Sequence, residues 1–263
     1  HRMEIEGTGL LHPFIATQGQ YDLAHALRER TGQAITVLGG DPDLVAYADF
    51  KHHIRAQAVE LGIPVAPGEV VDAALVASAV ERHLRRTGRV IVRGASGAAG
   101  SATFVCDGTG DSVSKLATHV SGRTDNRLYL VEVMYQPVAS PNVQIHVSRN
   151  GSTTFVGITD QMLDSRLTHC GNAFPSAAAC SRDMVRWASR LGGWLGDMGY
   201  TGIAGFDFVE YTGGDGARKA FLAELNPRVN GATYPLAVRE RLGPTSAFVS
   251  GSVKTRVNSF AEL

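Results

Sequence analysis

The feature that most constrains the fold of this chain is a pair of apolar stretches that carry isolated polar residues. Residues 204–211 and 220–226 predict two β-strands, and the turn-rich segment 212–216 joins them. Successive side chains of a strand point to opposite faces, so residues spaced by two share a face. If the two strands pair, Asp207 on the first lies beside Glu224 on the second. The chain therefore predicts a hairpin with one packed face and one polar face.

The polar face of this hairpin offers the ligand types of a magnesium site. Glu224, Asn226 and Arg228 occupy alternate positions after an apolar run. Carboxylate and carboxamide oxygens are hard donors, and proteins typically hold Mg²⁺ with one or two carboxylates plus substrate phosphates. Asp207, Glu224 and Asn226 are thus candidate metal ligands, and Arg228 is a candidate to hold a phosphoryl group or a substrate carboxylate. A polar strand face that only meets water has the same composition, so both interpretations stay open.

A run of small residues lies between two further predicted strands. Residues 94–101 connect the strands expected at 89–93 and 102–106. Because glycine lets the main chain approach a ligand closely, Gly97 and Gly100 could cover phosphates with backbone N–H groups. The context differs from the strand–loop–helix of a P-loop, and a simple turn is the alternative interpretation.

Two cations stand at positions where they could reach a phosphate. Arg93 ends the strand expected before the small-residue run, and Lys51 begins a helix expected over residues 51–61, which Gly62 and Pro64 terminate. A solvated side chain is the commoner situation for either residue.

The remaining pattern predicts a mixed chain of helices and strands. Asp111 is expected to cap a helix, and Asn150-Gly151 favours a tight hairpin turn. The amphipathic helix expected at 184–198 should pack its two tryptophans. Helices are also expected at 21–30, 75–84 and 111–120, strands at 34–38, 128–135, 143–147 and 153–158, and a polar loop through residues 159–175.

Composition excludes several classes of partner and site. The 263 residues include 25 Lys plus Arg and 25 Asp plus Glu, so no bulk charge attracts nucleic acid or a membrane surface. The three cysteines are too few and wrongly spaced for a disulfide framework or a zinc site. We expect a cytoplasmic protein without a membrane span. The unusual start at His1-Arg2-Met3 also suggests a fragment of a longer protein.

Taken in order, these pieces resemble an ATP-grasp protein. The resemblance covers roughly residues 35–240 and rests on an ordered set of motifs. These are Lys51 followed by Leu61-Gly62-Ile63-Pro64-Val65-Ala66-Pro67, the strand ending in Arg93, the small-residue loop, Val131-Glu132-Val133-Met134, Gly202-Ile203-Ala204-Gly205-Phe206-Asp207-Phe208, and Glu224-Leu225-Asn226-Pro227-Arg228.

The resemblance implies an α+β protein with the ATP-grasp fold, in which two α+β subdomains clasp ATP beside a partial N-terminal α/β unit. Residues 1–50 would be the remnant of the N-terminal domain. Residues 51–130 would form the small subdomain with the glycine-rich loop, and residues 131–263 the large subdomain with the magnesium and phosphate site.

The resemblance also implies a role for each matched residue. ATP and Mg²⁺ would be the cofactors, and Asp207, Glu224 and Asn226 would hold the metal, with Glu224 as the bridge. Arg228 would act with Glu224 in catalysis by stabilising the transferred phosphoryl group. The remaining contacts to ATP would come from Lys51, Arg93, Gly97, Gly100, Ser101, Glu132, Val133 and Met134.

This chain departs from the family pattern in two places. Arg93 stands where the family usually has lysine, and an arginine fork does not copy the geometry of an ammonium group. Many members have a glutamate for the ribose about where this chain has Ser140-Pro141-Asn142, so the ribose contact is unassigned.

The family implies an ATP-dependent carboxylate-amine ligase that uses an acyl phosphate and releases ADP and phosphate. Its partners would be small-molecule or peptide carboxylates and amines, and a homodimer is compatible with the family. Residues 158–161 with Gly171 and Pro175 resemble peptide ligases of secondary metabolism, including the pheganomycin type. In the loop Asp164 to Pro175, Arg166 and His169 could face the acceptor, and solvated loop residues are the commoner alternative. A kinase acting on a hydroxyl and a nucleotide-binding module without chemistry are the alternatives.

Overall fold

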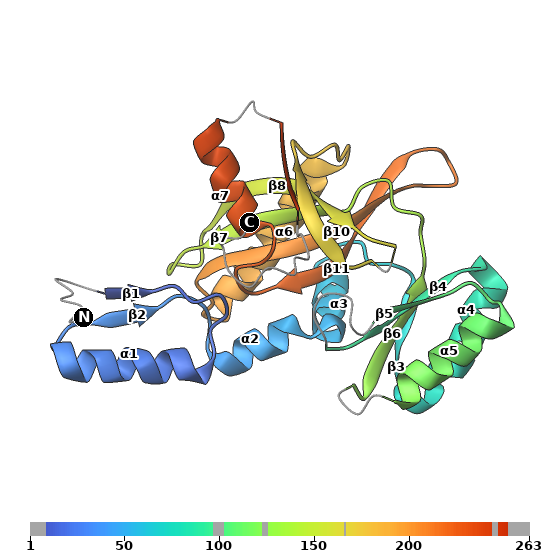
Figure 1. Cartoon of the computed structure of the whole chain (residues 1–263), viewed down its shortest axis with the longest axis horizontal. Coiled ribbons are helices and arrows are strands. Elements are labelled where there is room, and N and C mark those ends of the chain that lie inside the picture. The colour runs from blue at the N-terminus through green and yellow to red at the C-terminus, as the bar shows by residue number, and fades with distance from the viewer. Residues whose placement is uncertain (1–8, 97–102, 123–125, 166, 244–246, 252–263) are drawn as a thin grey trace, which may run out of the picture.

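The computed structural model describes residues 9–96, 103–122, 126–165, 167–243 and 247–251, and Figure 1 shows them in three parts. A small N-terminal unit lies at one end, a four-stranded sheet at the other, and a six-stranded sheet between them. The two larger sheets are the parts that build the candidate site.

The N-terminal unit is a short parallel β–α–β arrangement. Strand β1 (Gly9–Leu11) pairs with β2 (Ile35–Val37), and α1 (Gln18–Thr31) connects them and packs on β2. The helix ends at Gly32, whose φ of 69° is left-handed, a conformation that glycine adopts without steric cost. The helix and the strand predicted in this region are both confirmed.

Two helices then lead from this unit toward the six-stranded sheet. Helix α2 (Pro42–Asp49) was not predicted from the sequence, although Asp41 caps it and Pro42 occupies its first turn. Helix α3 (Lys51–Glu60) begins at Lys51, as predicted. Its Ile54 and Ala58 are buried in the same core as the six-stranded sheet, so this helix holds Lys51 against that sheet.

The four-stranded sheet is antiparallel throughout, with the strand order β3-β6-β4-β5. Helix α4 packs on this sheet and α5 packs on β5, so that Val80, Val90 and Tyr129 are buried between the layers. The elements are β3 (Gly68–Asp72), η1 (Ala73–Leu75), α4 (Val76–Thr87), β4 (Val90–Gly94), β5 (Thr103–Cys106), α5 (Gly110–Ser121) and β6 (Leu128–Val133).

One detail of this sheet corrects the sequence analysis. The cap of α5 is Thr109, whose hydroxyl accepts a hydrogen bond from the backbone N–H of Ser112 at 3.3 Å. The prediction that Asp111 caps this helix is wrong, because the helix begins at Gly110 and Asp111 lies within its first turn.

The six-stranded sheet is also antiparallel, with the order β11-β10-β7-β8-β9-β12. Its strands are β7 (Pro141–Val147), β8 (Thr153–Leu163), β9 (His169–Phe174), β10 (Gly202–Thr212), β11 (Arg218–Asn226) and β12 (Phe248–Gly251). Helix α6 (Ser181–Asp197) covers one face, where its Leu191 and Leu195 are fully buried, and α7 (Thr233–Leu242) follows β11. The two tryptophans of α6 pack against this core, as predicted.

The predicted polar loop over residues 159–175 is wrong. Strand β8 continues to Leu163 and the chain returns as β9. Thr159 and Asn172 are almost completely buried, and the Thr159 hydroxyl donates to the carbonyl of Ala173 at 3.0 Å. Thr159 and Asn172 are therefore buried polar residues of a sheet, which sequence polarity alone does not distinguish from those of a solvated loop.

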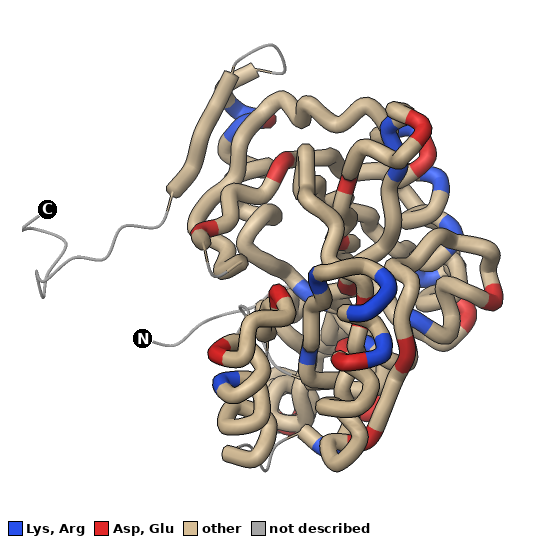
Figure 2. The backbone as a smooth tube through the Cα atoms, turned by 90° about the vertical axis from the view of Figure 1, so that its right-hand side faces the viewer, with Lys and Arg blue, Asp and Glu red and all other residues tan. Residues whose placement is uncertain are grey.

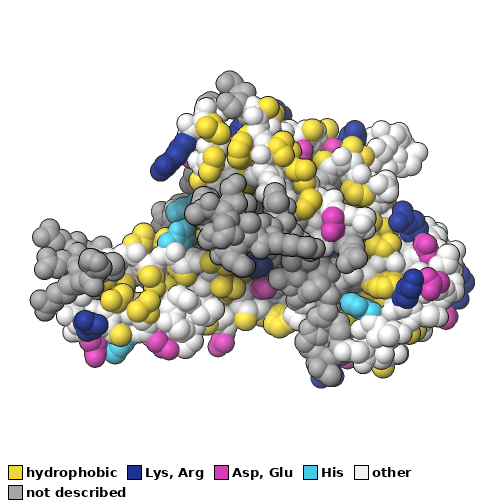
Figure 3. All heavy atoms as spheres, in the orientation of Figure 1, with side chains coloured by type: hydrophobic (Ala, Val, Ile, Leu, Met, Phe, Trp, Pro, Cys, Tyr) yellow, Lys and Arg dark blue, Asp and Glu magenta, His cyan; other side chains and the backbone are white. Residues whose placement is uncertain are grey.

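The segment before β3 connects the two larger sheets. Leu222 of β11 donates its backbone N–H to the carbonyl of Pro64 at 2.8 Å, and Val65 forms a parallel bridge with Leu222. Basic and acidic residues are mixed over the faces seen in Figures 2 and 3. Within the described ranges, no helix has the length and apolar character needed to cross a membrane.

Candidate functional site

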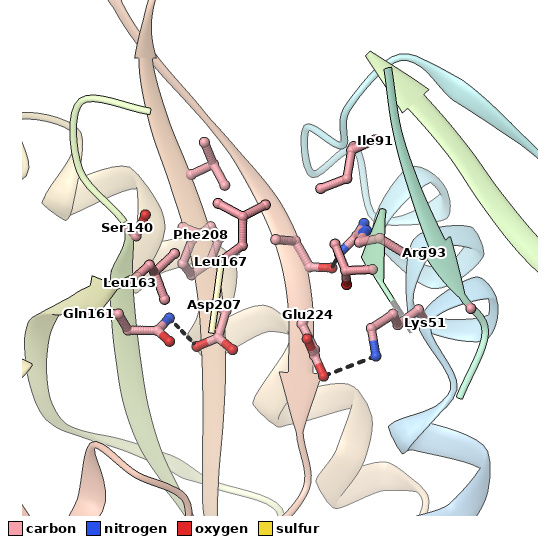
Figure 4. A pocket seen from close by; sticks show the side chains of 14 residues that line it. Lys51, Ile91, Arg93, Ser140, Gln161, Leu163, Leu167, Asp207, Phe208 and Glu224 are labelled. Atoms are coloured by element: carbon pink, nitrogen blue, oxygen red, sulfur yellow. Dashed lines mark hydrogen bonds and ion pairs between the residues drawn. The ribbon is translucent and has the colours of Figure 1, made fainter. Parts of the chain in front are cut away.

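The polar face predicted for the last hairpin assembles between β10 and β11. Asp207 is paired with Glu224 in the strand register, and Gly205 is paired with Asn226. The side-chain Nδ2 of Asn226 donates to Asp207 Oδ2 at 3.0 Å. Figure 4 shows Asp207 and Glu224 on these adjacent strands at one side of a pocket. The three predicted metal ligands are therefore neighbours.

The carboxylate of Asp207 is half-buried and lies among amide groups. Its Oδ1 accepts hydrogen bonds from Asn142 Nδ2 at 2.5 Å and from Gln161 Nε2 at 2.8 Å. Burial is the main cause that raises the Asp207 pKa from 3.8 to about 7, and the nearby Glu224 carboxylate adds to the shift. A bound cation would favour the ionised form of both carboxylates, so their proximity fits a metal site.

This raised pKa gives a first testable prediction. The native state holds a proton on Asp207 between the ordinary pKa of 3.8 and the folded value of about 7, whereas the unfolded chain has lost that proton. The resulting contribution to the free energy of unfolding is present below the lower pKa and disappears as the pH rises through the higher one. Chemical denaturation should show that wild type loses stability relative to Asp207→Asn between about pH 4 and about pH 7, by at most about 4 kcal/mol.

The control for this prediction is Asp22→Asn, which removes an exposed carboxylate on α1. Its stability should follow that of wild type at every pH. Parallel curves for wild type and Asp207→Asn would show that the Asp207 carboxylate ionises in the native state as it does in the unfolded chain.

A chain of buried carboxamides fixes the orientation of these ligands. Gln144 is fully buried, and its Nε2 donates to Asn142 Oδ1 at 2.6 Å and to Asn230 Oδ1 at 2.9 Å. Asn142 is paired with Asp207 across β7 and β10. The sequence analysis assigned no role to Gln144, although its alternation with Asn142 in an apolar strand was a signal.

Lys51 approaches Asp207, Glu224 and Asn226, the candidate metal cluster, from the side of α3. Its side chain is 7% exposed, and its Nζ lies 3.2 Å from Glu224 Oε1, as Figure 4 shows. The backbone N–H of Lys51 donates to the carbonyl of Ala95 at 3.0 Å, which ties the start of α3 to the end of β4. The predicted phosphate-binding lysine and the predicted bridging carboxylate thus lie together.

Arg93 links the two larger sheets. Its Nε and Nη2 donate to Glu132 Oε2 at 3.0 and 2.5 Å, while its Nη1 donates to the carbonyl of Ala223 on β11 at 2.8 Å. Burial disfavours the Arg93 cation, but the carboxylates of Glu132, Glu224 and Asp207 together outweigh this cost and raise the Arg93 pKa. All three side-chain nitrogens therefore have protein partners. Arg93 also lines the pocket, and its contact with ATP stays a prediction.

Glu132 is held by a second arginine that the sequence analysis missed. Arg55 Nη1 donates to Glu132 Oε1 at 2.6 Å, and Glu132 is only 2% exposed. Arg55 lies one turn after Lys51 on α3, which is the signal that could have found it. Its side chain also donates to the carbonyls of Ala66 and Gly68, at 2.7 and 3.1 Å.

An apolar compartment of the cleft lies beyond Arg93. Its walls include Val133, Met134, Tyr135 and Phe221, and Glu132 also lines it. The rings of Tyr135 and Phe221 have centroids 5.8 Å apart. The backbone N–H groups of Val133 and Met134 already donate to the carbonyls of residues 67 and 89, at 2.8 and 3.2 Å. The residues predicted to hold adenine thus line a largely apolar space.

A second compartment lies on the other side of the metal cluster, and we name it after Arg228. Its walls include Phe14, His169, Arg228 and Asn230. Arg228 is 13% exposed and forms an ion pair with Asp49, a residue of α2 that the sequence analysis did not consider. His169 begins strand β9, and its role toward an acceptor stays a prediction. Arg166 lies outside the described residues.

The central compartment of the cleft is lined by Lys51, Asp207 and Glu224. It is contiguous with the apolar compartment and with the Arg228 compartment. Leu163 and Leu167 from the β8–β9 hairpin line all three, and Figure 4 shows both beside Asp207. Leu167 has a φ of 61°, which side chains with a Cβ rarely adopt. The predicted loop residues Gly97, Gly100 and Ser101 lie outside the described residues.

The donor set of the central compartment suits a hard cation. Within the described ranges, no three His, Cys, Asp or Glu side chains gather at one place. A metal here would be held by the carboxylates of Asp207 and Glu224 and by the Asn226 side-chain oxygen, which is a typical set for Mg²⁺ when phosphate oxygens complete the shell. Asn226 would have to turn its oxygen to the metal, because its Nδ2 now faces Asp207.

Comparison with known proteins shows the fold. No protein-family model matches this sequence, and no curated protein matches it. Among solved structures, the biotin carboxylase domain of 2-oxoglutarate carboxylase from Hydrogenobacter thermophilus matches with a TM-score of 0.64 and 14% identity, over 87% of this chain and 50% of that one. This chain thus spans about half the length of that protein.

Two other solved structures give the same result. N5-carboxyaminoimidazole synthase from Aspergillus clavatus matches with a TM-score of 0.58 and 13% identity, over 83% of this chain and 58% of that one. The D-alanine-D-alanine ligase from Coxiella burnetii matches with a TM-score of 0.58 and 17% identity, over 86% of this chain and 62% of that one. The chain therefore has the ATP-grasp fold, as the ordered motifs of its sequence predict.

Proposed function

We propose that this protein is an ATP-dependent ligase that joins a carboxylate to an amine through an acyl phosphate, with release of ADP and phosphate. One observation carries the proposal. The cluster of Asp207, Glu224 and Asn226 lies between an apolar compartment that suits a nucleobase and a compartment that contains Arg228. The fold also supports it, because the biotin carboxylase domain was solved with MgADP and bicarbonate and the synthase with ADP.

In this proposal each part of the cleft has one task. Residues 132–134 hold the adenine edge, and Lys51 and Arg93 attract the phosphates. Asp207, Glu224 and Asn226 hold Mg²⁺, which neutralises phosphate charge when bound. Arg228 holds the incoming carboxylate or the transferred phosphoryl group.

The proposed chemistry has two steps. An oxygen of the carboxylate attacks the γ-phosphorus of ATP, and ADP leaves with the electron pair of the broken P–O bond. The amine then attacks the acyl carbon, loses a proton and releases phosphate. Positioning and charge stabilisation by the residues above supply the acceleration. The narrower resemblance to peptide ligases leaves the choice of amine as a prediction.

Trapping with hydroxylamine tests the proposal. Incubation of the protein with ATP, Mg²⁺, a panel of carboxylic acids and hydroxylamine should produce a hydroxamate together with ADP, because hydroxylamine captures an acyl phosphate. Colorimetric detection of the hydroxamate and coupled detection of ADP measure both products. ADP that depends on an added alcohol, without any hydroxamate, would instead favour a kinase. ATP binding without ADP release under any condition would favour a binding module.

A further inference from the structure

We propose that the Arg228 compartment selects a carboxylic acid that carries an apolar side group, and that Phe14 is the residue that determines this specificity. The inference rests on the proposed function, because it names the class of acid that the ligase would activate. It depends on two sets of groups in one compartment, one that suits a carboxylate and one that suits a hydrocarbon.

The polar wall of this compartment presents donors to an anion. The Nη1 of Arg228 donates a hydrogen bond to Asp49 Oδ1. The other side-chain nitrogens of Arg228 have no hydrogen-bond partner among the described residues. Asn230 also lines the compartment, but its Nδ2 is shielded from solvent and packs on Gly205. A ligand carboxylate beside the Arg228 guanidinium would gain charge-assisted hydrogen bonds.

His169 also lines this compartment. The Nδ2 of Asn172 donates to the Gly231 carbonyl at 3.0 Å and lies 3.1 Å from His169 Nε2. Because Asn172 Nδ2 can only donate, His169 Nε2 is the acceptor of this hydrogen bond. The neutral ring then carries its proton on Nδ1. The ring packs on Gly231, where an added Cβ would lie 2.7 Å from His169 Cε1.

The charge of the compartment excludes a basic side group. Among the described residues, Asp207 and Glu224 are the two acids that line it, and both belong to the proposed metal cluster. A cationic side group would therefore find no carboxylate of its own. The carboxylate end of a substrate is recognised, whereas a charge on its side group is not.

The apolar lining of this compartment comes from segments that are distant in the sequence. Phe14 is 53% exposed, and its backbone carbonyl accepts the N–H of Val229 at 3.0 Å, which holds it beside Arg228. Leu163 at the end of β8 is 36% exposed. Large apolar side chains that remain exposed in a cleft are typical of ligand contacts. The hydrocarbon part of the acid would lie against Phe14 and Leu163.

A matched pair of acids tests this selectivity. 4-Methylpentanoate and succinamate have the same heavy-atom skeleton, but the first ends in an isopropyl group and the second in a carboxamide. Leucine and asparagine form the same pair with an α-amino group. In the hydroxylamine assay, the apolar member of at least one pair should be preferred by about tenfold or more in kcat/KM. Equal use of both members in each pair would overturn the inference and leave the proposed function intact.

Substitution of Phe14 assigns the selectivity to this residue. Phe14→Ala should reduce the preference for the apolar acid by about tenfold, mainly through a higher KM, because the lost contact is one made by bound substrate. Leu10→Ala removes another exposed side chain of the N-terminal unit, 63% exposed and outside the compartment, and should keep the wild-type preference. An unchanged preference in Phe14→Ala would contradict the role of Phe14.

A binding measurement separates failure of the inference from failure of the proposed function. With Mg²⁺ and a non-hydrolysable ATP analogue present, 4-methylpentanoate or leucine should raise the melting temperature of wild type more than succinamate or asparagine does. Phe14→Ala should lose this difference. Selective binding without any hydroxamate would contradict the ligase function and support the proposed selectivity of the Arg228 compartment. Hydroxamate formation without selective binding would support the ligase function and contradict the selectivity.

Discussion

Glu224→Gln should reduce acid-dependent ADP release by about a thousandfold. The substitution keeps the shape of the side chain but removes the charge that we assign to the bridging metal ligand. Glu224 lies beside Asp207 in the strand register and 3.2 Å from Lys51 Nζ, so it is the point where the metal cluster and the predicted phosphate-binding lysine meet. The coupled ADP assay measures the effect.

The same variant should also lose some stability. Lys51 is 7% exposed, and without Glu224 its ammonium group loses the carboxylate that compensates its burial. We expect a cost of about 2 kcal/mol in the free energy of unfolding. Activity must therefore be measured well below the melting temperature. Glu60→Gln, which changes an exposed glutamate of α3, should keep both activity and stability. Wild-type turnover in Glu224→Gln would contradict the assigned role.

Arg93→Leu should lower the free energy of unfolding by about 3 kcal/mol or more. Glu132 is 2% exposed, and Arg93 contributes two of the hydrogen bonds that compensate its buried charge. The substitution also removes the hydrogen bond to the Ala223 carbonyl, which joins the four-stranded sheet to the six-stranded sheet. Urea denaturation of the whole chain measures the loss.

A surface ion pair provides the matched control for this prediction. Arg127 Nε lies 3.2 Å from Asp72 Oδ1, but the two side chains are 90% and 52% exposed. Exposed ion pairs contribute little, so Arg127→Leu should change the stability by about 0.5 kcal/mol or less. If the two substitutions lowered the free energy of unfolding equally, the contribution of Arg93 to stability would not depend on the burial of Glu132.

Much of the fold could be predicted because its signals are local. The alternation of residues 204–211 and 220–226 predicted the β10–β11 hairpin, and a hairpin of adjacent strands has few possible registers. That is why Asp207, Glu224 and Asn226 could be grouped before any tertiary structure was known. The start of α3 at Lys51 was similarly predicted from helical spacing and from Gly62 and Pro64.

Predictions failed for polar residues that are buried and for contacts between residues that are far apart in the sequence. Residues 159–175 were expected to be a loop, because Thr159 and Asn172 read as solvated although both are buried in the sheet. The partners of the site residues also come from remote segments. Asp49 pairs with Arg228, and Arg55 pairs with Glu132, across separations that no local periodicity reports.

The sequence by itself determined the order of the motifs, the polar face of the last hairpin and the identity of the proposed metal ligands. These follow from strand alternation and from side-chain chemistry, which act within a few residues. Tertiary structure alone decided that Arg93 is engaged by Glu132, that carboxamides of β7 orient Asp207, and that Phe14 stands beside Arg228. Packing between distant segments sets those contacts, because burial and hydrogen-bond satisfaction are properties of the whole folded chain.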